Sequence, residues 1–315
     1  MHLSETGCFA DLKTLEPGPD LIPYEVSSAL WTDGAFKLRY MVVPSSEQIK
    51  MREDGAWLFP EGSVLIKVFG FDMASDQAAR PRAVETRFMV RHSGKWEYAT
   101  YRWNDAGTEG DLLEEGATVE YTVYRDGEPA SLAYVFPDYD TCVACHGSGI
   151  GEVLGPKTNQ LNRDRDYGGL VVNQLRAMDE IDLLNFESGS ELQPARLPTM
   201  ANPQVGLGTL ESRARAYLDA NCAHCHQPGA WAPSDIGLDL RYEVALEVTG
   251  LCDAMRYFEW DGMARVAPGD PERSGLLHRF VLQDELRMPS TGTSVVDPLG
   301  TSLLHDWIAA LDTCP

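Results

Sequence analysis

Apolar and polar positions alternate in short runs through the first 140 residues of the chain. The runs are separated by turn-forming residues, as expected for strands. Ser93-Gly94 and Arg125-Asp126-Gly127-Glu128 are turn signals of the kind that join neighbouring strands. The pattern predicts an antiparallel sheet or barrel, with strands at Arg39–Val43, Ala56–Phe59, Ser63–Phe71, Val84–Arg91, Trp96–Trp103, Ala117–Tyr124 and Ala133–Phe136.

A helical period replaces this alternation in the second half of the chain. Apolar residues over 170–184 follow the 3.6-residue repeat, and those over 210–218 line one face of a helix that leads into Cys222. Asp270-Pro271 pairs an N-cap residue with a proline in the first turn, which predicts a helix through about Leu282. The apolar spacing over 303–311 predicts a terminal helix.

These patterns predict an α+β protein of two domains. A chain of 315 residues is long enough for two hydrophobic cores. We expect an antiparallel β-rich domain with a trailing helix over 1–187 and an all-α domain over 209–315. Residues 188–208 are rich in Pro, Gly, Ser and Asn, and we interpret them as the linker. No apolar run approaches the length that spans a bilayer.

Two copies of the pattern Cys-x-x-Cys-His stand out, at 142–146 and 222–226. On a helical turn, residues three and four apart share a face, so the two cysteines can reach one edge of a flat macrocycle while the histidine points at its centre. This geometry suits a haem attached by two thioethers, with the histidine as proximal iron ligand. The pattern therefore predicts two c-type haems, held by Cys142, Cys145 and His146 and by Cys222, Cys225 and His226. His224, between the cysteines, is expected to face solvent.

Zinc is the alternative for these cysteines, because two Cys-x-x-Cys pairs can close a tetrahedral structural site. Both pairs, however, carry the histidine that haem needs and that a four-cysteine zinc site does not. The segment between the pairs is also longer than the spacing of usual zinc modules. The sequence favours haem.

Residues 209–315 resemble the class I cytochromes c, especially the cytochrome c-like modules of bacterial multidomain proteins. The matching stretches are Tyr217–His226, Pro268–Ser274, Arg287-Met288-Pro289 and Leu304–Leu311. The resemblance implies that Met288, in a Met-Pro pair, is the distal iron ligand. A thioether favours Fe(II), and a haem with both axial positions filled suits electron transfer. The rival ligands in this region are Met255, Met263, His278 and His305.

The N-terminal part loosely resembles the small β-sheet cytochromes c, which include the haem–lysine cross-linked cytochromes and the cytochromes c-prime-beta. The matching stretch is Phe59–Lys67, although Glu61 and Ser63 depart from the family's Asp and Thr. The whole chain also resembles an uncharacterised bacterial dihaem family, at Leu3–Gly7 and Ile22–Val26. The resemblance makes Lys67 a candidate residue of the first haem pocket. The alternative is a lysine that protects an edge strand from aggregation.

The distal ligand of the first haem cannot be assigned from the sequence, so an open or weakly occupied site is one reading. His92 lies beside a predicted hairpin tip, and Met89 and Met178 are equally well explained as packing residues. Arg87 and Arg91 occupy alternate strand positions, where they either serve haem propionates or solvate one face of the sheet.

Charge and cysteine content bear on location and partners. The formal charge of −22 disfavours nucleic acid and anionic membranes as partners and favours a basic redox partner protein. Covalent haem attachment takes place outside the cytoplasm, so we expect a periplasmic or extracellular protein, although the start of the chain has no signal-peptide pattern. Of the three other cysteines, we pair Cys252 with Cys314, which lie in the same half of the chain. Cys8 is then either a free thiol or paired with another chain.

Two functions follow from these observations. The first is a dihaem c-type cytochrome that transfers electrons between its two haems and an external partner. The second is a haem enzyme whose open first haem acts on peroxide, nitric oxide or hydroxylamine while the second haem supplies or removes electrons. The sequence does not decide whether the protein is an enzyme.

Overall fold

The chain is described here by a computed structural model that covers residues 1–74, 81–147, 153–186, 191–206, 208–256 and 262–314. It forms two compact units. The first unit contains residues 1–26, 34–143 and 156–198, and the second contains residues 27–33, 144–155 and 199–315. The boundary falls inside helix α1 (Tyr139–His146), which carries the first Cys-x-x-Cys-His motif. Part of the predicted linker, residues 188–190 and 207, lies outside the described residues.

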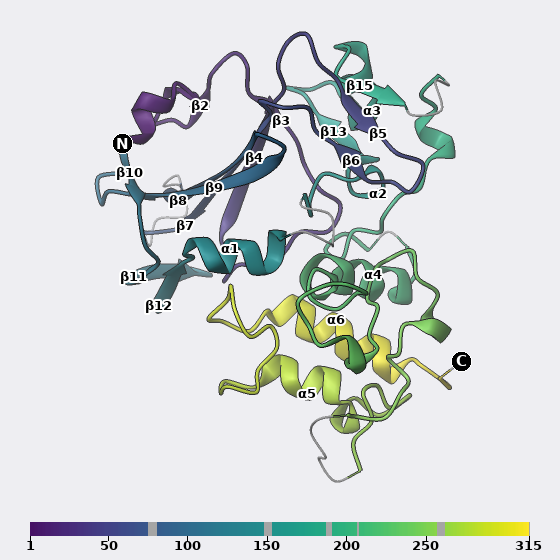
Figure 1. Cartoon of the computed structure of the whole chain (residues 1–315). Coiled ribbons are helices and arrows are strands. Elements are labelled where there is room, and N and C mark those ends of the chain that lie inside the picture. The colour runs from purple at the N-terminus through teal and green to yellow at the C-terminus, as the bar shows by residue number, and fades with distance from the viewer. Residues whose placement is uncertain (75–80, 148–152, 187–190, 207, 257–261, 315) are drawn as a thin grey trace. The chain divides into compact units, whose positions relative to one another are not determined.

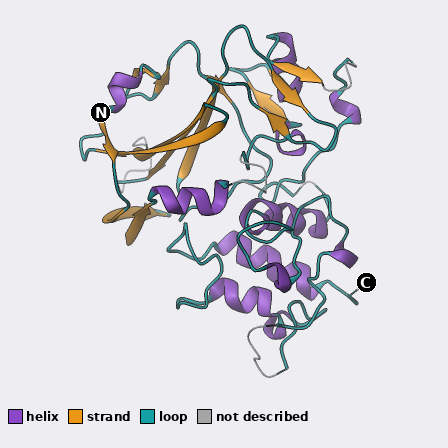
Figure 2. Ribbon diagram, in the orientation of Figure 1, coloured by secondary structure: helices purple, strands orange, loops and turns teal. Residues whose placement is uncertain are grey.

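The first unit is organised on an antiparallel six-stranded sheet with the order β10-β9-β8-β7-β4-β3 (Figures 1 and 2). The predicted turns are confirmed: Ser93 and Gly94 both have positive φ between β8 and β9, as do Asp126 and Gly127 between β11 and β12. Such turns match the twist of the strands that they join. The bounds are β3 (Ile22–Pro23), β4 (Phe36–Val42), β7 (Val64–Phe71), β8 (Arg82–His92), β9 (Lys95–Trp103), β10 (Gly110–Leu113), β11 (Ala117–Arg125) and β12 (Glu128–Phe136).

One face of this sheet forms the core of the first unit. Its buried residues come from alternate positions of neighbouring strands, among them Ile66, Val68, Phe88, Tyr101 and Trp103. The apolar and polar residues that alternate along these strands are therefore the side chains that point into and away from this core. The predicted β-rich N-terminal region is confirmed.

Shorter elements complete the first unit, and most of them were not predicted. A parallel pairing joins β15 to β5, so that a late segment lies beside an early one. The remaining bounds are η1 (Leu3–Thr6), β1 (Phe9–Asp11), β2 (Glu16–Pro17), β5 (Ile49–Met51), β6 (Trp57–Leu58), α2 (Thr158–Leu161), β13 (Asp164–Asp166), β14 (Val171–Asn173), α3 (Gln174–Glu180), β15 (Leu184–Phe186) and η2 (Pro194–Arg196). The helix predicted over 170–184 is too long at both ends, because strands β14 and β15 flank α3.

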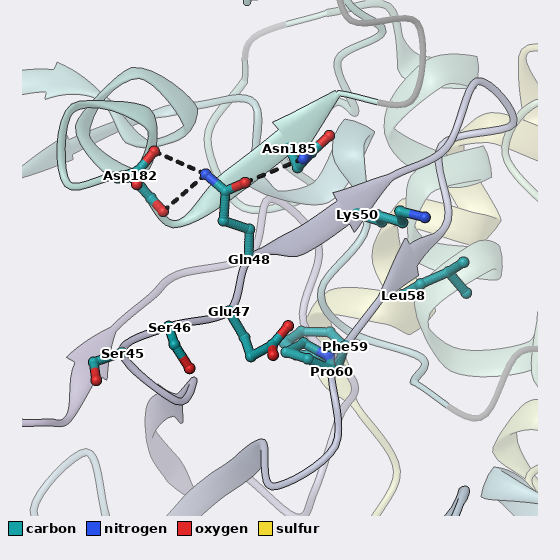
Figure 3. Close-up of a pocket in the computed structure, with 10 residues that line it drawn as sticks. All are labelled: Ser45, Ser46, Glu47, Gln48, Lys50, Leu58, Phe59, Pro60, Asp182 and Asn185. Atoms are coloured by element: carbon teal, nitrogen blue, oxygen red, sulfur yellow. Dashed lines mark hydrogen bonds between the residues drawn. The ribbon is translucent and has the colours of Figure 1, made fainter.

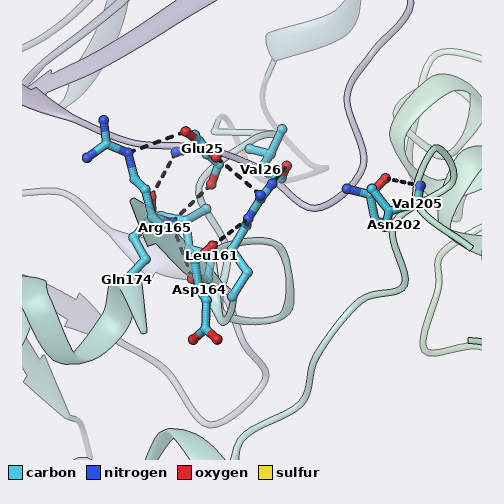
Figure 4. Close-up of polar contacts among 9 residues, drawn as sticks. Glu25, Val26, Leu161, Asp164, Arg165, Gln174, Asn202 and Val205 are labelled. Atoms are coloured by element: carbon cyan, nitrogen blue, oxygen red, sulfur yellow. Dashed lines mark hydrogen bonds and ion pairs between the residues drawn. The ribbon is translucent and has the colours of Figure 1, made fainter. Parts of the chain in front are cut away.

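Polar contacts hold Glu25, in the N-terminal segment, against Arg165 and Gln174 later in the chain (Figure 4). The backbone N–H of Glu25 donates to the Gln174 side chain over 2.8 Å, and that side chain donates back to the Glu25 carbonyl over 3.0 Å. Arg165 forms an ion pair with Glu25 at 3.5 Å. Residues 25 and 26 are thus held firmly where the chain leaves the first unit.

The second unit consists of helices and loops, with no strand among its described residues (Figure 2). Helix α6 packs against α4, and Tyr217, Phe280, Leu303 and Trp307 lie in the shared core. The bounds are α4 (Leu210–Leu218), η3 (Asp219–Ala223), η4 (Ser234–Ile236), η5 (Leu246–Val248), η6 (Pro271–Arg273), α5 (Gly275–Val281) and α6 (Pro298–Ala309). The predicted helix through Leu282 begins at the Asp270 cap but is interrupted at Ser274, where a short 3-10 turn gives way to α5.

The predicted disulfide between Cys252 and Cys314 is confirmed, with Cα atoms 5.7 Å apart. It ties the C-terminal tail to a loop of the second unit. Cys8 is a free thiol, half-buried. In the described part of the chain, no helix has the length and apolar character that a membrane crossing requires.

Candidate functional site

The second Cys-x-x-Cys-His motif continues directly from a buried helix. Thr209 caps α4 by accepting a hydrogen bond from Ser212 N over 3.1 Å, and the last five residues of the helix are buried. The helix then widens into the turn η3. Both Cys225 N and His226 N donate to the Cys222 carbonyl, over 3.1 and 2.9 Å. The motif therefore occupies a hydrogen-bonded helical turn, as its spacing predicted.

Partial burial of the motif side chains shifts their pKa values. Burial raises the pKa of the Cys222 thiol to about 12. Burial is also the largest cause that lowers the pKa of His226 to about 4, with smaller contributions from His224, Arg279 and Arg265. His226 is therefore a neutral imidazole near pH 7, which is the form that binds a metal. Within the described residues, its buried Nδ1 atom has no hydrogen-bond partner.

Arg279 connects the predicted distal ligand to this histidine. Its carbonyl accepts the backbone N–H of Met288 over 2.9 Å, and its Nε donates to the Leu286 carbonyl over 2.9 Å. Its guanidinium lies close enough to His226 to disfavour the charged imidazolium. Met288 is half-buried in an irregular segment. The sequence contained no signal for Arg279, whose role here depends on the path of the loop.

The rival ligands differ in their surroundings. His305 is exposed on α6 and contacts the neighbouring Asp306 at 3.1 Å. Met255 packs against the first turn of α5, where a Cβ on Gly275 would meet its sulfur. Met263 and His278 are both half-buried. These surroundings make His305 a surface residue and Met255 a packing residue.

The first motif lies on a helix of a different character. Asp138 caps α1, because its carboxylate accepts Thr141 N over 2.8 Å, and hydrogen bonds from Thr141 lower the pKa of Asp138. No residue of α1 is fully buried, and Cys142, Cys145 and His146 are all half-buried. The helical turn is present at this motif, but it is not enclosed by a core.

Lys67 lies on the sheet face that is turned towards α1. The strand register aligns Lys67 with Arg87, and Met89 with Tyr98, on this face. The Tyr98 ring lies 5.7 Å from the ring of Tyr139, in the first turn of α1. Since β7 is paired on both sides, Lys67 does not protect a sheet edge. Its Nζ lies 5.6 Å from the centre of the Phe69 ring.

Arg87 is held by a buried carboxylate beside Lys67. Two guanidinium nitrogens contact the Glu85 carboxylate at 2.7 and 2.8 Å, and the Tyr134 hydroxyl donates to the same carboxylate over 2.5 Å. The Glu85 side chain is fully buried. Burial alone would lower the pKa of Arg87. Glu85, Tyr134 and Cys142 outweigh this effect, so the pKa of Arg87 is raised and its guanidinium stays charged. Arg87 is therefore bound to a buried carboxylate and is not a side chain that simply solvates one face of the sheet.

The candidate distal ligands of the first motif lie on two elements of the first unit, His92 and Met89 on β8 and Met178 on α3. His92 is exposed at the β8–β9 hairpin, as expected from the sequence. Met178 is buried in α3, in agreement with a packing role. Met89 is half-buried on β8. The structure does not single out one of them as a ligand.

The two motifs meet within the second unit. Donor atoms of Cys145, His224 and Cys225 all lie within 4.8 Å of one another. The two thiols share a hydrogen bond that lowers the pKa of Cys145 and raises that of Cys225. His224 is half-buried and belongs to this cluster, so the expectation that it faces solvent is wrong. Sequence spacing alone could not indicate that one cysteine of each motif would be a neighbour of the other.

A polar pocket of about 600 Å³ lies elsewhere, beside β5 and β6 of the first unit (Figure 3). Gln48 donates to Asp182 over 2.8 Å and accepts from Asn185 over 3.1 Å at its rim. None of the predicted haem or metal residues lines it. The pocket is lined by Ser45, Ser46, Glu47, Gln48, Lys50, Leu58, Phe59, Pro60, Asp182 and Asn185.

Comparison of the chain with protein-family models, with curated proteins and with solved structures found no match. The functional argument therefore depends on the residues themselves. At the second motif they fit a haem: two cysteines at the required spacing, a neutral, half-buried imidazole with a buried and unpartnered Nδ1, and a methionine thioether in the same unit.

Proposed function

We propose that the chain is a dihaem c-type cytochrome that transfers electrons between two covalently bound haems and an external redox partner. The observation that carries this proposal is the meeting of Cys145 and Cys225, one from each motif. Each of these cysteines would hold the edge of a different porphyrin. Two porphyrins anchored on neighbouring sulfur atoms would themselves be neighbours, which suits electron exchange.

The second haem would be held by Cys222 and Cys225, with His226 and Met288 as axial ligands. Such a haem supplies one-electron chemistry without an open coordination position. The protein contributes a histidine that stays neutral near pH 7, chiefly because of its burial. The link through Arg279 supports Met288 over its rivals as the distal ligand.

The first haem would be held by Cys142, Cys145 and His146, and here an enzymatic role is the second candidate. It is favoured by the charged face formed by Lys67 and Arg87, which is turned towards α1. The Lys67 ammonium on this face would stabilise negative charge on a ligand of an open iron, whereas the charge of Arg87 is balanced by Glu85. The candidate substrates are peroxide, nitric oxide and hydroxylamine, and Lys67 is then a residue of the pocket.

A metal other than haem iron is favoured by one observation, the cluster of Cys145, His224 and Cys225. Two thiolates and an imidazole are a ligand set that zinc accepts. This arrangement would compete with haem for Cys145 and Cys225. Haem remains the preferred reading because it also accounts for His146 and His226 in the two motifs.

We further propose a periplasmic or extracellular location and a basic protein as redox partner. The disulfide between Cys252 and Cys314 supports an oxidising compartment. The charge of −22 would attract a partner of opposite sign over a distance of about a Debye length.

Intact-mass measurement of the purified chain, together with optical spectra of both oxidation states, tests the proposal. We expect the added mass of two porphyrins. Cys142→Ser/Cys145→Ser and Cys222→Ser/Cys225→Ser should each retain one porphyrin, while the matched control Cys8→Ser retains two. A colourless chain that binds stoichiometric zinc, lost in a His224→Ala variant, would overturn the proposal in favour of the metal cluster.

Carbon monoxide added to the reduced protein separates the relay from the enzyme. Rapid binding at one haem, altered by Lys67→Met, would support an open first haem. Inertness at both haems would leave electron transfer alone. Met288→Ala should open the second haem to carbon monoxide and lower its potential, whereas Met263→Ala should not. An unchanged spectrum and potential in Met288→Ala would contradict the assignment of the distal ligand.

A further inference from the structure

A short segment of the N-terminal half belongs to the second unit. Residues 27–33, which we call the strap, leave the first unit after Val26, and the chain returns to the first unit at Gly34. Four of its seven residues are buried, namely Ser27, Ser28, Thr32 and Asp33. Such burial of a polar segment requires partners for its polar groups. Its contacts lead to two places in the second unit.

The first place is the loop that follows Met288. The carboxylate oxygen Oδ1 of Asp33 accepts the backbone N–H groups of both Ser294 and Val295 over 2.8 Å. The indole nitrogen of Trp31 donates to the Val295 carbonyl over 2.9 Å. A buried carboxylate that accepts two backbone N–H groups makes charge-assisted hydrogen bonds, which are stronger than neutral ones.

The same loop is bound by the residue that precedes Met288. The guanidinium of Arg287 donates to the Thr293 hydroxyl over 2.6 Å and to the Val295 carbonyl over 3.0 Å. Val295 is therefore held from one side by the strap and from the other by Arg287. Residues 293–295 are thus linked through the Arg287 side chain to the residue that precedes Met288.

The second place is the turn that carries Cys222. The backbone N–H of Trp31 donates to the Asn221 side chain over 2.6 Å. The amide of Asn221 donates back to the Ala29 carbonyl over 3.4 Å and to the Tyr217 carbonyl over 3.0 Å. Asn221 is buried and directly precedes Cys222. The strap thus connects the cysteine motif with the methionine loop.

We propose that Trp31 and Asp33 are positioning residues that hold Met288 in place for the iron carried on His226. This inference rests on the proposed function. The distal ligand is then kept in place by two residues of the N-terminal half, which lie outside the cytochrome-like residues 209–315. The C-terminal module is then incomplete without seven residues from the N-terminal half.

The test compares substitutions in the full-length protein. Asp33→Ala removes two hydrogen bonds to a buried carboxylate, so the population with Met288 detached should rise about a hundredfold. The measurements are carbon monoxide association with the reduced second haem and the sulfur-to-iron absorption band of the ferric haem. Amide hydrogen exchange at Ser294 and Val295 gives a readout that does not depend on the haem.

The conservative variants refine the test. Asp33→Asn keeps an oxygen that accepts both N–H groups, and it should restore most of the methionine signal. Trp31→Phe removes one neutral hydrogen bond, so its effect should be about fivefold. The matched controls are Trp231→Phe, at a side chain that is 63% exposed, and Asp312→Ala, at an exposed position. Both should leave the ligation and the exchange rates unchanged.

The outcomes distinguish this inference from the proposed function. If the wild type carries two haems and a methionine band, and if Asp33→Ala and Trp31→Phe leave both unchanged, the positioning role is overturned while the cytochrome stands. A lower melting temperature with an unchanged band would also overturn it. If the chain carries no porphyrin, the proposed function and the role towards Met288 fall together, and exchange at Val295 then reports only whether the strap holds the loop.

Discussion

The two Cys-x-x-Cys-His motifs share a five-residue pattern but differ in what surrounds them. The second follows α4, whose last five residues are buried in the core with Trp307 and Phe280. The first lies on α1, which has no fully buried residue, opposite a sheet face that carries Lys67 and Arg87. The same Cys-x-x-Cys-His spacing thus continues a buried helix in one case and faces a sheet that carries Lys67 and Arg87 in the other.

This difference teaches that the pentapeptide specifies a helical turn and not the environment of the group that it would hold. An apolar enclosure favours a neutral histidine and excludes water, which suits electron transfer. On the face opposite the first motif, the Lys67 ammonium would stabilise an anionic ligand, while Arg87 is balanced by Glu85. If both motifs hold haem, we expect the first haem to be the more reactive and the second the better insulated.

The largest predicted effect concerns the charged face of the first unit. Arg87→Met leaves the fully buried Glu85 carboxylate without its cation and should destabilise the first unit by about 4 kcal/mol. Denaturant unfolding, followed by hydrogen exchange in β8 and in α6, would assign the loss to one unit. The double variant Glu85→Gln/Arg87→Met removes both charges and should recover a large part of it. A loss below about 1 kcal/mol in Arg87→Met would show that this pair does not support the fold.

A smaller effect is expected from the covalent link of the second unit. Cys252→Ser/Cys314→Ser opens a loop that spans a sequence separation of 62 residues. The lost constraint on a random unfolded chain corresponds to about 4 kcal/mol, which residual structure in the unfolded chain reduces to about 3 kcal/mol. Thermal unfolding should show the loss in the second unit, while exchange in β7 and β8 stays unchanged. Cys8→Ser is the control, because Cys8 forms no disulfide. Equal destabilisation of both units would mean that they do not unfold independently.

The sequence predicted what depends on local pattern. Strand alternation located the main sheet and the separate β11–β12 hairpin. Positive-φ turns join β8 to β9 at Ser93-Gly94 and β11 to β12 at Asp126-Gly127, and the cap at Asp270 marked a helix start. It failed where long-range contacts decide. The helix over 170–184 was too long because pairing of β15 with β5 captures its end. The neighbouring positions of Cys145 and Cys225, and the strap that carries Asp33, depend on contacts between distant segments, for which a single sequence has no signal.

A pH-dependent effect of similar size is expected from a buried tyrosine in the first unit. Burial raises the pKa of Tyr24 to about 12, from an ordinary value near 10. The folded state therefore keeps its proton where the unfolded state has lost it. Stability is fully present below about pH 10 and falls as the pH rises towards 12, by about 2.5 kcal/mol. Tyr24→Phe should flatten this alkaline loss in the denaturation midpoint.

Tyr217 offers the matching comparison in the second unit. Burial and the neighbouring Asp297 both raise the pKa of Tyr217, so the second unit should also lose stability at high pH. Tyr217→Phe should remove that loss, together with the hydrogen bond to Asp297 that measures 2.8 Å. If Tyr24→Phe changed the loss of stability at high pH in both units, the two units would not unfold independently.

The smallest predicted effect tests how tightly the core behind the second motif is packed. Gly300 lies in α6, where a Cβ would collide with the ring and hydroxyl of Tyr217 on α4. Alanine is the better helix former by about 1 kcal/mol, so Gly300→Ala would stabilise the protein if space allowed. Because the collision involves a ring fixed by Asp297, we expect overpacking to win and the free energy of unfolding to fall by about 1 kcal/mol. Gly206→Ala is the matched control, since nothing lies within 4 Å of the added carbon, and it should be neutral or slightly stabilising. A stabilised Gly300→Ala would show that α4 and α6 can separate without cost, and the contrast between an enclosed second motif and an open first motif would lose its main support.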